Sequence, residues 1–283
     1  MITRLANDYP VNVVCELLGC SRSTYYYQPA VNSADAAMIE VIERILMRWP
    51  FYGYRRVTAQ LKRAGHNVGE TLIRRLLKQL GHSCSVGRVR VVTTNSDHDL
   101  PRYPNLFKAL KITHPNQAWV ADITYIRLRR RFIYLAVILD AYTRNLRGWH
   151  LSRSLEQGLT VTALRMALAR HPTPKTHHSD QGSQYAAAAY TDLLLASAIQ
   201  ISMTAAGQPT ENGLVERFIR TLKEEHVDYT EYENFADAFK QLAHWLEVEY
   251  MTERIHSALG YLTPTEFEVA VGINQPNPLL IQV

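Results

Sequence analysis

Residues 118–128, AWVADITYIRL, are the stretch that decides the fold class. Their β-branched and aromatic side chains favour a β-strand. The segments RFIYLAVILDAYT (131–143) and NLRGWHLS (145–152) follow with the same texture and short links, which predicts a three-strand antiparallel meander. We expect the remaining elements as helix 155–171, strand 175–180, helix 183–198, strand 199–204, helix 210–227 and helix 236–250. This alternation predicts an α/β fold with a mixed sheet and helices packed on it.

The residues before the meander read as helices. VNVVCELLG (11–19) and CSRSTYYYQ (20–28) have the outline of a short helix-turn-helix within residues 1–30, with the break at Gly19. Residues 34–82 predict three further helices, the last two stopped by Gly65 and Gly81. Their polar faces carry seven basic residues: Arg55, Arg56, Lys62, Arg63, Arg74, Arg75 and Lys78. One acid, Glu70, lies in this interval, so a DNA contact is favoured over an ordinary solvated surface.

Composition limits the function classes. The 283 residues are 47% hydrophobic and 20% charged, which is enough for a packed core and excludes a disordered chain. No apolar run is long enough for a membrane span and the N-terminus lacks a secretory h-region, so we expect a cytoplasmic protein. Three cysteines are too few for a disulfide framework, and the Cys and His residues do not have the spacing of a structural zinc site. Residues 83–116 are expected to be a linker and residues 273–283 a tail.

Two aspartates lie in or at the end of a predicted strand, where a carboxylate needs a structural or functional explanation. Asp122 sits inside the first strand and shares a face with Val120, Thr124 and Ile126 by alternation. A carboxylate there is unfavourable unless it is paired or binds a metal; a surface position or an arginine partner is the alternative. Asp180 ends the strand 175–180 within HHSDQGSQY (177–185). An Asx-turn or a helix cap explains such an aspartate equally well.

Glu216 is the third acid, in LVERFIRTLK (214–223). The apolar positions of this helix, Val215, Phe218, Ile219 and Leu222, form the stripe expected to be buried. Glu216, Arg220 and Lys223 then share a second face, and Glu216 with Arg220 could be no more than a surface pair. The three acids together favour a functional site more strongly than each acid does alone. The reason is their spacing: 35 residues, 181 to 215, separate Asp180 from Glu216.

Two aspartates and a glutamate at this spacing resemble the DDE transposases and retroviral-type integrases, which share a ribonuclease-H-like fold. The flanking motifs narrow the resemblance. NQAWVADITYI (116–126), HHSDQGSQY, NGLVERFIRTLKEE (212–225) and RIHSALGYLTPTEF (254–267) look like the second-frame product of IS3-family insertion-sequence transposases. YGYRRV (52–57) is similar to the helix-turn-helix that precedes the catalytic core in that family. The resemblance covers nearly the whole chain and implies a catalytic domain at residues 117–272.

The resemblance also implies roles by position. Asp122, Asp180 and Glu216 match the acidic triad, which in the family binds two Mg²⁺ ions, with Mn²⁺ able to substitute. Lys223 matches a basic residue that approaches the DNA end, and we place Arg217 and Arg220 with it on the DNA. The expected supporting residues are Gly182, Gln184, Asn212, Asp140 and His178. Histidine prefers softer metals than this chemistry needs, so His177 and His178 are not expected to be bases or ligands. Glu211 stands where the family usually has Asp.

The implied function is DNA transposition: metal-dependent 3′-end cleavage at terminal inverted repeats, followed by strand transfer. The implied partners are double-stranded DNA, a small helix-turn-helix and coiled-coil protein from the upstream frame, and further copies of this chain on the DNA. Two alternatives stay open. One is a nuclease of the same fold that cuts without joining, and the other is a DNA-binding regulator with vestigial acids.

Overall fold

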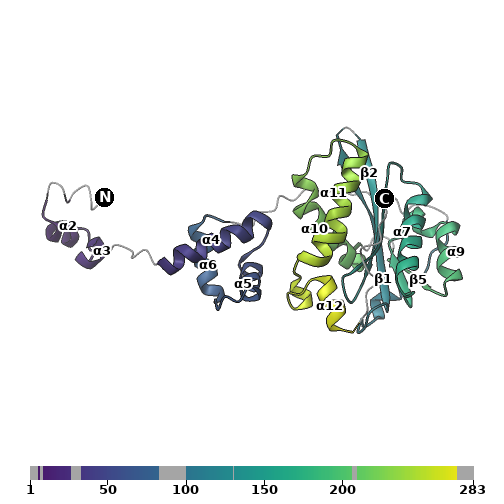
Figure 1. Ribbon diagram of the computed structural model, residues 1–283, viewed down its shortest axis with the longest axis horizontal. Helices are drawn as coiled ribbons and strands as arrows, with labels where there is room; N and C mark the ends of the chain where they lie inside the picture. Colours follow the sequence, from purple (N-terminus) through teal and green to yellow (C-terminus); the bar gives the residue numbers. More distant parts are fainter. Residues whose placement is uncertain are drawn as a thin grey trace. The chain divides into compact units, whose positions relative to one another are not determined.

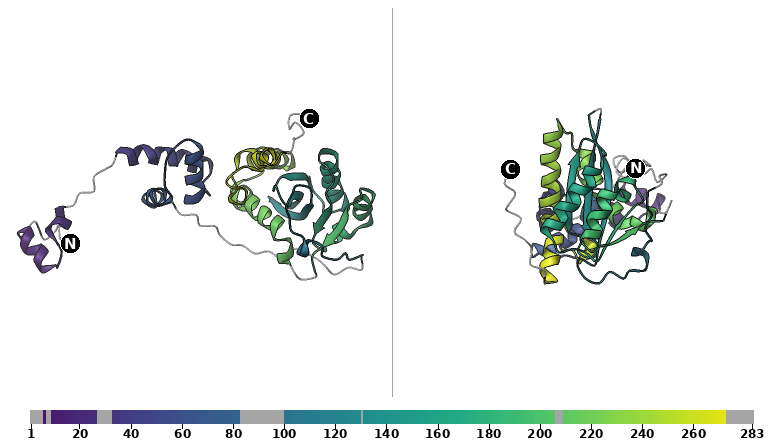
Figure 2. Two further views of the ribbon diagram at one scale, coloured as in Figure 1. Left: turned by 90° about the horizontal axis from the view of Figure 1, so that it is seen from below. Right: turned by 90° about the vertical axis from the view of Figure 1, so that its right-hand side faces the viewer.

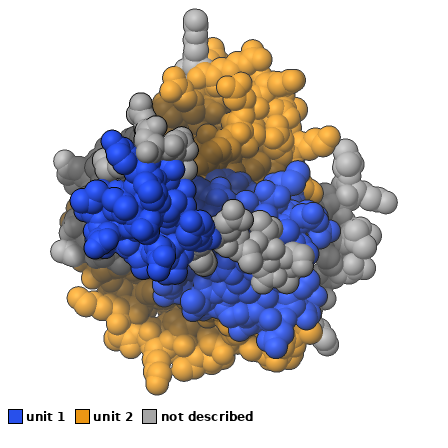
Figure 3. Space-filling view, turned by 90° about the vertical axis from the view of Figure 1, so that its left-hand side faces the viewer, with its two compact units in different colours: residues 1–84 blue, residues 85–283 orange. Residues whose placement is uncertain are grey.

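The protein is described by a computed structural model that defines residues 6, 9–26, 33–82, 100–129, 131–205 and 209–272 (Figure 1). It divides into two compact units, Met1–Cys84 and Ser85–Val283, which Figure 3 colours separately. Each unit is described by itself below. Within the described ranges, no helix combines the length and the apolar character that crossing a bilayer requires.

The first unit is entirely helical. Its helices are α2 (Val11–Leu17), α3 (Arg22–Tyr26), α4 (Ser33–Arg48), α5 (Tyr54–Arg63) and α6 (Glu70–Gln79). Gly65 and Gly81 follow α5 and α6 with φ angles of 86° and 66°, a left-handed conformation that closes a helix and favours glycine. The expected helices and their stop signals are therefore present. The buried hydrophobic side chains of α4–α6 and their links are Ile42, Trp49, Tyr52, Val57, Leu61, Val68, Ile73, Leu76 and Leu77.

The second unit contains a five-stranded sheet in the order β3-β2-β1-β4-β5. The strands are β1 (Ala118–Leu128), β2 (Arg131–Asp140), β3 (Leu146–Ser152), β4 (Thr176–Ser179) and β5 (Gln200–Met203). β1, β2 and β3 pair antiparallel, whereas β4 runs parallel to β1 and β5 parallel to β4. The expected meander and mixed sheet are confirmed.

Helices cover both faces of this sheet, as Figure 1 and the view from below in Figure 2 show. One face carries α7 (Gln157–Arg170), α8 (Ser183–Ala186) and α9 (Ala188–Ala196), and the other carries α10 (Gly213–Glu225), α11 (Phe235–His244) and α12 (Pro264–Ala270). A separate apolar core lies on each side. Gly148 of β3 lets α7 lie close to the sheet, because a Cβ there would collide with the backbone of Ala163. The sheet is thus covered on both faces.

Two expected helices differ in detail. The stretch 183–198 breaks at Ala187, whose extended backbone (ψ 140°) separates α8 from α9. The stretch 236–250 begins as α11 and continues as a π-helix, Trp245–Glu253. The wider winding brings Trp245 and Tyr250, five positions apart, into the same core with ring centroids 5.6 Å apart. Periodicity calibrated on the α-helix does not anticipate such a change of winding.

The described part of the expected linker, residues 100–116, packs on the second unit. Ser202 of β5 accepts hydrogen bonds at its Oγ from the backbone N–H groups of Leu106 and Phe107, at 2.9 and 3.2 Å. Phe107, Leu110 and Ile112 lie partly buried against the apolar core. A polar, proline-containing composition suggested a linker, but these apolar contacts and the hydrogen bonds to Ser202 hold the segment on the sheet.

Candidate active site

Asp122 lies near the middle of β1, opposite Val137 of β2. Its neighbours on the same face, Val120 and Ile126, are fully buried in the core under α10, as the alternation pattern predicts. The carboxylate is half-buried, and its Oδ1 accepts a hydrogen bond from the backbone N–H of Ile123 at 2.7 Å. An acid is therefore present on the apolar face of a central strand.

Asp180 follows the end of β4, and the strand register determines where it falls. In the parallel pair, Val120 of β1 is the partner of His178 of β4. Continuing this register by two residues brings Asp180 level with Asp122. The Asp180 Oδ1 accepts a hydrogen bond from the N–H of Gly182 at 3.0 Å, which fixes the carboxylate in an Asx-turn. A Cβ on Gly182 would lie 2.9 Å from that oxygen, so glycine is needed beside it.

Glu216 lies in the first turn of α10. Val215, Phe218 and Leu222 bury the apolar stripe of this helix in the core it shares with β1, and Ile219 is partly buried there, as expected. Asn212, immediately before the helix, donates from its Nδ2 to the backbone carbonyl of Ala121 at 3.1 Å. The beginning of α10 is therefore fastened to the residue before Asp122, which carries Glu216 toward the same place. The Asn212 Oδ1 is buried without a hydrogen-bond partner among the described residues.

The electrostatics show that these groups share one site. Burial raises the pKa of Asp122 well above its usual range, and the nearby carboxylates of Asp180 and Glu216 raise it further. The Ile123 N–H and the Lys223 ammonium lower it in part. Burial lowers the pKa of Lys223, while Asp228 and Asp122 raise it. Three neighbouring carboxylates and one lysine leave an excess of negative charge at this place, which a bound cation would offset.

Carboxylate oxygens are the ligands that Mg²⁺ and Mn²⁺ prefer, so the chemical type of the site fits a hard divalent ion. Among the described residues, however, no group of three His, Cys, Asp or Glu side chains lies close enough together to hold an ion as the site stands. The acids are within electrostatic range of each other without forming a finished cage. Mutual repulsion between carboxylates is the physical reason to expect such an open arrangement before an ion arrives.

The two histidines of HHSDQGSQY point into the structure. The His177 Nε2 lies 2.9 Å from the hydroxyl of Tyr190, and the His178 Nδ1 lies 2.9 Å from the Oγ of Ser202. His178 also stacks on Phe107, with ring centroids 4.7 Å apart. Burial lowers the pKa of His177 to about 3 and that of His178 to about 4. Both are neutral at physiological pH, and their contacts hold β4 to its neighbours.

Asp140 lies in a different environment from the three acids. It is fully buried at the end of β2, where it accepts hydrogen bonds from the N–H groups of Asn116, Tyr142 and Thr143. Arg147 lies 3.3 Å from Asp140 and 2.7 Å from Glu268 of α12. This network holds α12 to the β2–β3 connection, which fits the supporting role expected for Asp140.

Glu211 is also occupied elsewhere. Its Oε2 accepts hydrogen bonds from the Asn105 side chain and the Ala205 backbone at 2.7 and 2.8 Å, and Lys108 lies 3.6 Å from its Oε1. Glu211 therefore fastens the segment around residue 105 to the connection between β5 and α10.

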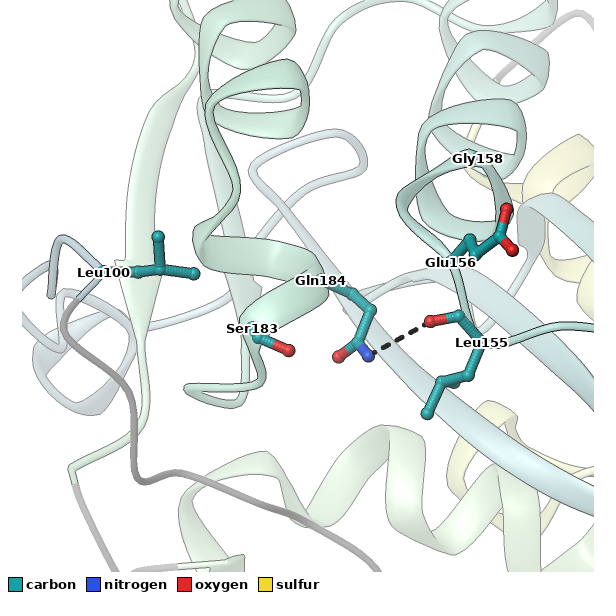
Figure 4. Close-up of a pocket in the computed structure, with 6 residues that line it drawn as sticks. All are labelled: Leu100, Leu155, Glu156, Gly158, Ser183 and Gln184. Atoms are coloured by element: carbon teal, nitrogen blue, oxygen red, sulfur yellow. Dashed lines mark hydrogen bonds between the residues drawn. The ribbon is translucent and has the colours of Figure 1, made fainter.

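Gln184 lies in a pocket of ≈ 480 Å³ shown in Figure 4. Its Nε2 donates to the backbone carbonyl of Leu155 at 3.4 Å, which links α8 to the residues before α7. The other residues lining this pocket are Leu100, Glu156, Gly158 and Ser183.

Sequence reasoning missed two tyrosines near the acids. Tyr185, five residues after Asp180, has a buried hydroxyl without a hydrogen-bond partner among the described residues. Burial, then Tyr190, and then Asp122 and Asp180 raise the pKa of Tyr185. Burial, then Tyr134, and then Asp180 and Asp122 raise the pKa of Tyr125. Tyr185 lies inside the motif HHSDQGSQY, but nothing in that motif indicates that its hydroxyl is buried near the acids.

The basic residues expected on DNA lie in both units. Arg217 and Arg220 are exposed on α10. In the first unit, six of the seven are exposed and Arg56 is half-buried. Contacts within the unit orient two of them. Arg74 lies over the ring of Tyr54 at 4.3 Å, and Arg75 forms a bidentate ion pair with Asp35 at 3.0 Å. The polar faces of α5 and α6 are thus basic surfaces, with Arg75 held by an acid.

Comparisons with known proteins agree with this picture. Two family models described as "Integrase core domain" match residues 112–209 and 197–264, and a model described as "HTH-like domain" matches residues 33–90. A chain of the simian T-cell lymphotropic virus intasome, seen by cryo-EM in complex with the PP2A regulatory subunit B56 gamma, has the same fold. Its TM-score is 0.50 at 19% identity, with 84% of this chain and 78% of that chain covered.

Sequence relatives are closer. The insertion element IS600 uncharacterized 31 kDa protein of Shigella sonnei is 35% identical over 263 residues, which are 90% of this chain and 97% of the relative. The transposase for insertion sequence element IS904 of Lactococcus lactis is 32% identical over 77% of this chain and 87% of its own. Transposase InsF for insertion sequence IS3A of Escherichia coli is 28% identical over 92% and 94%. The chain belongs to the family of IS3-type insertion-sequence transposases, enzymes of the DDE polynucleotidyl transferase class.

Proposed function

We propose that Asp122, Asp180 and Glu216 are the catalytic, metal-binding triad of this transposase, and that the chain cleaves 3′ ends at terminal inverted repeats and joins them to target DNA. The observation that carries the proposal is the strand register. It brings Asp180 level with Asp122, and the Asn212 bond to Ala121 holds the α10 turn bearing Glu216 against the same strand. The raised pKa of Asp122, caused by burial and by both other acids, supports a shared site.

The proposed reaction has two steps, hydrolysis at the element end and transfer of that end to the target. In the first, water attacks a phosphorus atom at the element end, the bond from phosphorus to the 3′ oxygen breaks, and a free 3′-hydroxyl is left. In the second, that hydroxyl attacks a phosphodiester of the target, a new bond to phosphorus forms and a target 3′-hydroxyl leaves. When two Mg²⁺ or Mn²⁺ ions are bound by the triad, they supply positive charge at the attacking and leaving oxygens and activate the nucleophile.

Other residues of the chain have supporting roles in this proposal. Gly182 leaves room for the Asp180 carboxylate and fixes it through its N–H. Asn212 holds the α10 start in place, and its unpartnered Oδ1 is available to a water molecule or an N–H group in the working complex. Lys223, which lies near Asp122, would bind a DNA phosphate next to the cut.

DNA would be bound by basic surfaces on both units. The residues we assign are Arg217, Arg220 and Lys223 on α10, and Arg55, Arg56, Lys62, Arg63, Arg74, Arg75 and Lys78 in the first unit. The match to an HTH-like domain implies a DNA partner for residues 33–90. The contact to bases and the contact to the cleaved phosphate would then come from different units of one chain.

The test is a cleavage and joining assay on DNA that carries the inverted repeats of the element, with Mg²⁺. Asp122→Asn, Asp180→Asn and Glu216→Gln are each expected to lower both steps by roughly 10³-fold while DNA binding survives. Supplying an end already cut to a 3′-hydroxyl separates joining from cutting. A nuclease of the same fold would cut but give no joined product, and a regulator with vestigial acids would lose nothing in the three variants.

We also propose that the chain works with a small protein from the upstream frame and as a homo-oligomer on DNA. This rests on the family resemblance. Specific cleavage of the element ends by this chain alone, at full rate, would contradict the need for the partner. Sedimentation of the DNA complex measures the number of copies.

A further inference from the structure

The hairpin of β1 and β2 extends beyond the rest of the sheet. Among the described residues, β4 pairs with β1 only at 118–120, and β3 pairs with β2 only from Tyr134 onward. Residues 126–128 and 131–133 therefore form a two-stranded ribbon; together with Tyr125 and Tyr134 at its base, it is called the aromatic ribbon below. Its base lies three residues along β1 from Asp122.

One face of the aromatic ribbon carries rings. Tyr125 is directly opposite Tyr134, and Arg127 is opposite Phe132, so alternation places all four on one face. The rings of Tyr125 and Tyr134 meet edge-on with centroids 5.1 Å apart, and those of Tyr125 and Phe132 with centroids 6.4 Å apart. The two tyrosines are half-buried, while Phe132 is 56% exposed. The ring of Phe132 thus contacts the ring of Tyr125 on one side and is open to solvent on the other.

Positive charge surrounds these rings. Arg127, Arg129 and Arg131 are exposed, and residues 123–134 contain no Asp or Glu. Arg129 lies at the turn with a φ of 52° and accepts a hydrogen bond at its carbonyl from the Arg127 Nε at 3.2 Å. The arginines therefore provide a polyanion-binding surface around an exposed ring.

The ribbon is close to the acids. Asp180 and Asp122 both contribute to the raised pKa of Tyr125, after burial and Tyr134. The base of the ribbon is therefore within electrostatic range of the acids, while alternation places its rings on the sheet face opposite to Asp122.

We propose that the aromatic ribbon binds an unpaired DNA base of an element end, with the base stacked on Phe132 and its backbone held by the flanking arginines. This rests on the proposed function for its location. Paired DNA offers its phosphates but not the faces of its bases, so arginines alone would suffice for a duplex. An exposed ring among arginines fits single-stranded nucleic acid, in which every base has a π-face and every link a negative charge. The ribbon would hold the flank of an element end open during cutting.

The test compares forked DNA, with unpaired nucleotides beside the element end, with the same sequence fully paired. 2-Aminopurine at the first unpaired position reports stacking by its loss of fluorescence. Binding is measured without divalent ions, so no cutting occurs. Phe132→Leu, which keeps an apolar side chain but removes the ring, is expected to lower affinity for the fork about tenfold and to remove the quenching. Phe132→Trp is expected to keep both, and all variants are expected to bind the duplex alike.

The matched control is Tyr229→Leu, which removes a ring that is 69% exposed in the turn after α10. It is expected to change neither affinity nor quenching. Equal losses on fork and duplex, or wild-type behaviour of Phe132→Leu, would overturn the proposal; the second result would mark the face as an apolar contact for a protein. The binding measurements do not depend on catalysis. Cleavage or joining activity that survived in the triad variants would therefore refute the proposed function without changing the result for base stacking.

Discussion

Asp122 is the residue at which stability and function conflict most directly. It lies on the apolar face of a central strand, with two other acids nearby and one lysine to offset them. Burial and the two neighbouring acids disfavour the charged carboxylate, and the same features are typical of a cation site. The folded chain therefore has too little positive charge around this carboxylate, and the proposed metal binding would supply it.

We expect Asp122→Asn to stabilise the metal-free protein. Because the folded pKa of Asp122 lies above the unfolded one, the wild type loses stability as pH rises from the usual aspartate range through the raised folded value, and the loss is complete above it. Asparagine carries no charge at any pH. The thermal midpoint of the variant should exceed that of the wild type at pH 8, and the gap should close as pH falls. Mg²⁺ should also narrow the gap by raising the wild type alone; a less stable variant at pH 8 would contradict the burial argument.

Gly182→Ala is expected to separate folding from activity. The new Cβ would lie 2.9 Å from the Asp180 Oδ1 and would displace the carboxylate from its Asx-turn. A displacement of this size at a catalytic group costs about 10²-fold in rate. Cleavage should fall by that factor with the thermal midpoint little changed. The same substitution at Gly158, where a Cβ meets nothing within 4 Å, is the control.

Two buried tyrosines give opposite expectations. Tyr185→Phe removes a hydroxyl that has no hydrogen-bond partner among the described residues, so unfolding free energy should stay level or rise. Tyr190→Phe removes the partner of the His177 Nε2 and should cost about 1 kcal/mol. Denaturant unfolding measures both. A cost for Tyr185→Phe as large as that for Tyr190→Phe would show that the hydroxyl is bonded in the free protein.

At the scale of elements, short polar links position the site. The Asn212 bond to Ala121 joins α10 to β1, and the pair formed by Arg254 and Glu225, with contacts of 2.6 Å, holds the far end of α10 to the end of the π-helix. Apolar packing alone fixes a helix less strictly along its axis than such directional bonds do. The helix that carries Glu216 is thus anchored at both ends.

The buried arginine network is expected to dominate the stability of the C-terminal elements. Arg147→Leu would leave Asp140 and Glu268 buried without their cation and should cost about 3–5 kcal/mol. Arg170→Leu removes an exposed pair with Glu247 and should cost about 0–1 kcal/mol. Chemical denaturation distinguishes the two. Similar small losses in both variants would mean that water replaces Arg147.

At the scale of the whole molecule, the proposed chemistry lies in the second unit and the proposed DNA contacts lie in both units. Lys78→Ala, at the exposed end of α6, should weaken DNA binding uniformly and lower the slope of log affinity against log salt by about 1. Arg75→Ala should do less, because Arg75 is already paired with Asp35. Titration of labelled DNA at several salt concentrations gives the slopes, and equal slopes in the two variants would contradict this distinction.

The sequence by itself determined the meander, the helix stops at Gly65 and Gly81, the buried stripe of α10 and the three acids. These are local properties: alternation, periodicity and residue type are read from neighbours in the chain. The chemistry of histidine also led to the prediction that His177 and His178 are supporting residues, and both are buried in contacts within the fold.

Only the tertiary structure decided which polar groups meet. The parallel register of β4 on β1 brings Asp180 level with Asp122, Asn212 reaches Ala121 across 91 positions, and residues 100–116 pack on the sheet instead of linking two units. The orphan hydroxyl of Tyr185 and the exposed ring of Phe132 likewise have no signature in their own segments. Long-range pairing, burial and desolvation depend on what the rest of the chain places beside a residue, and no local pattern records that.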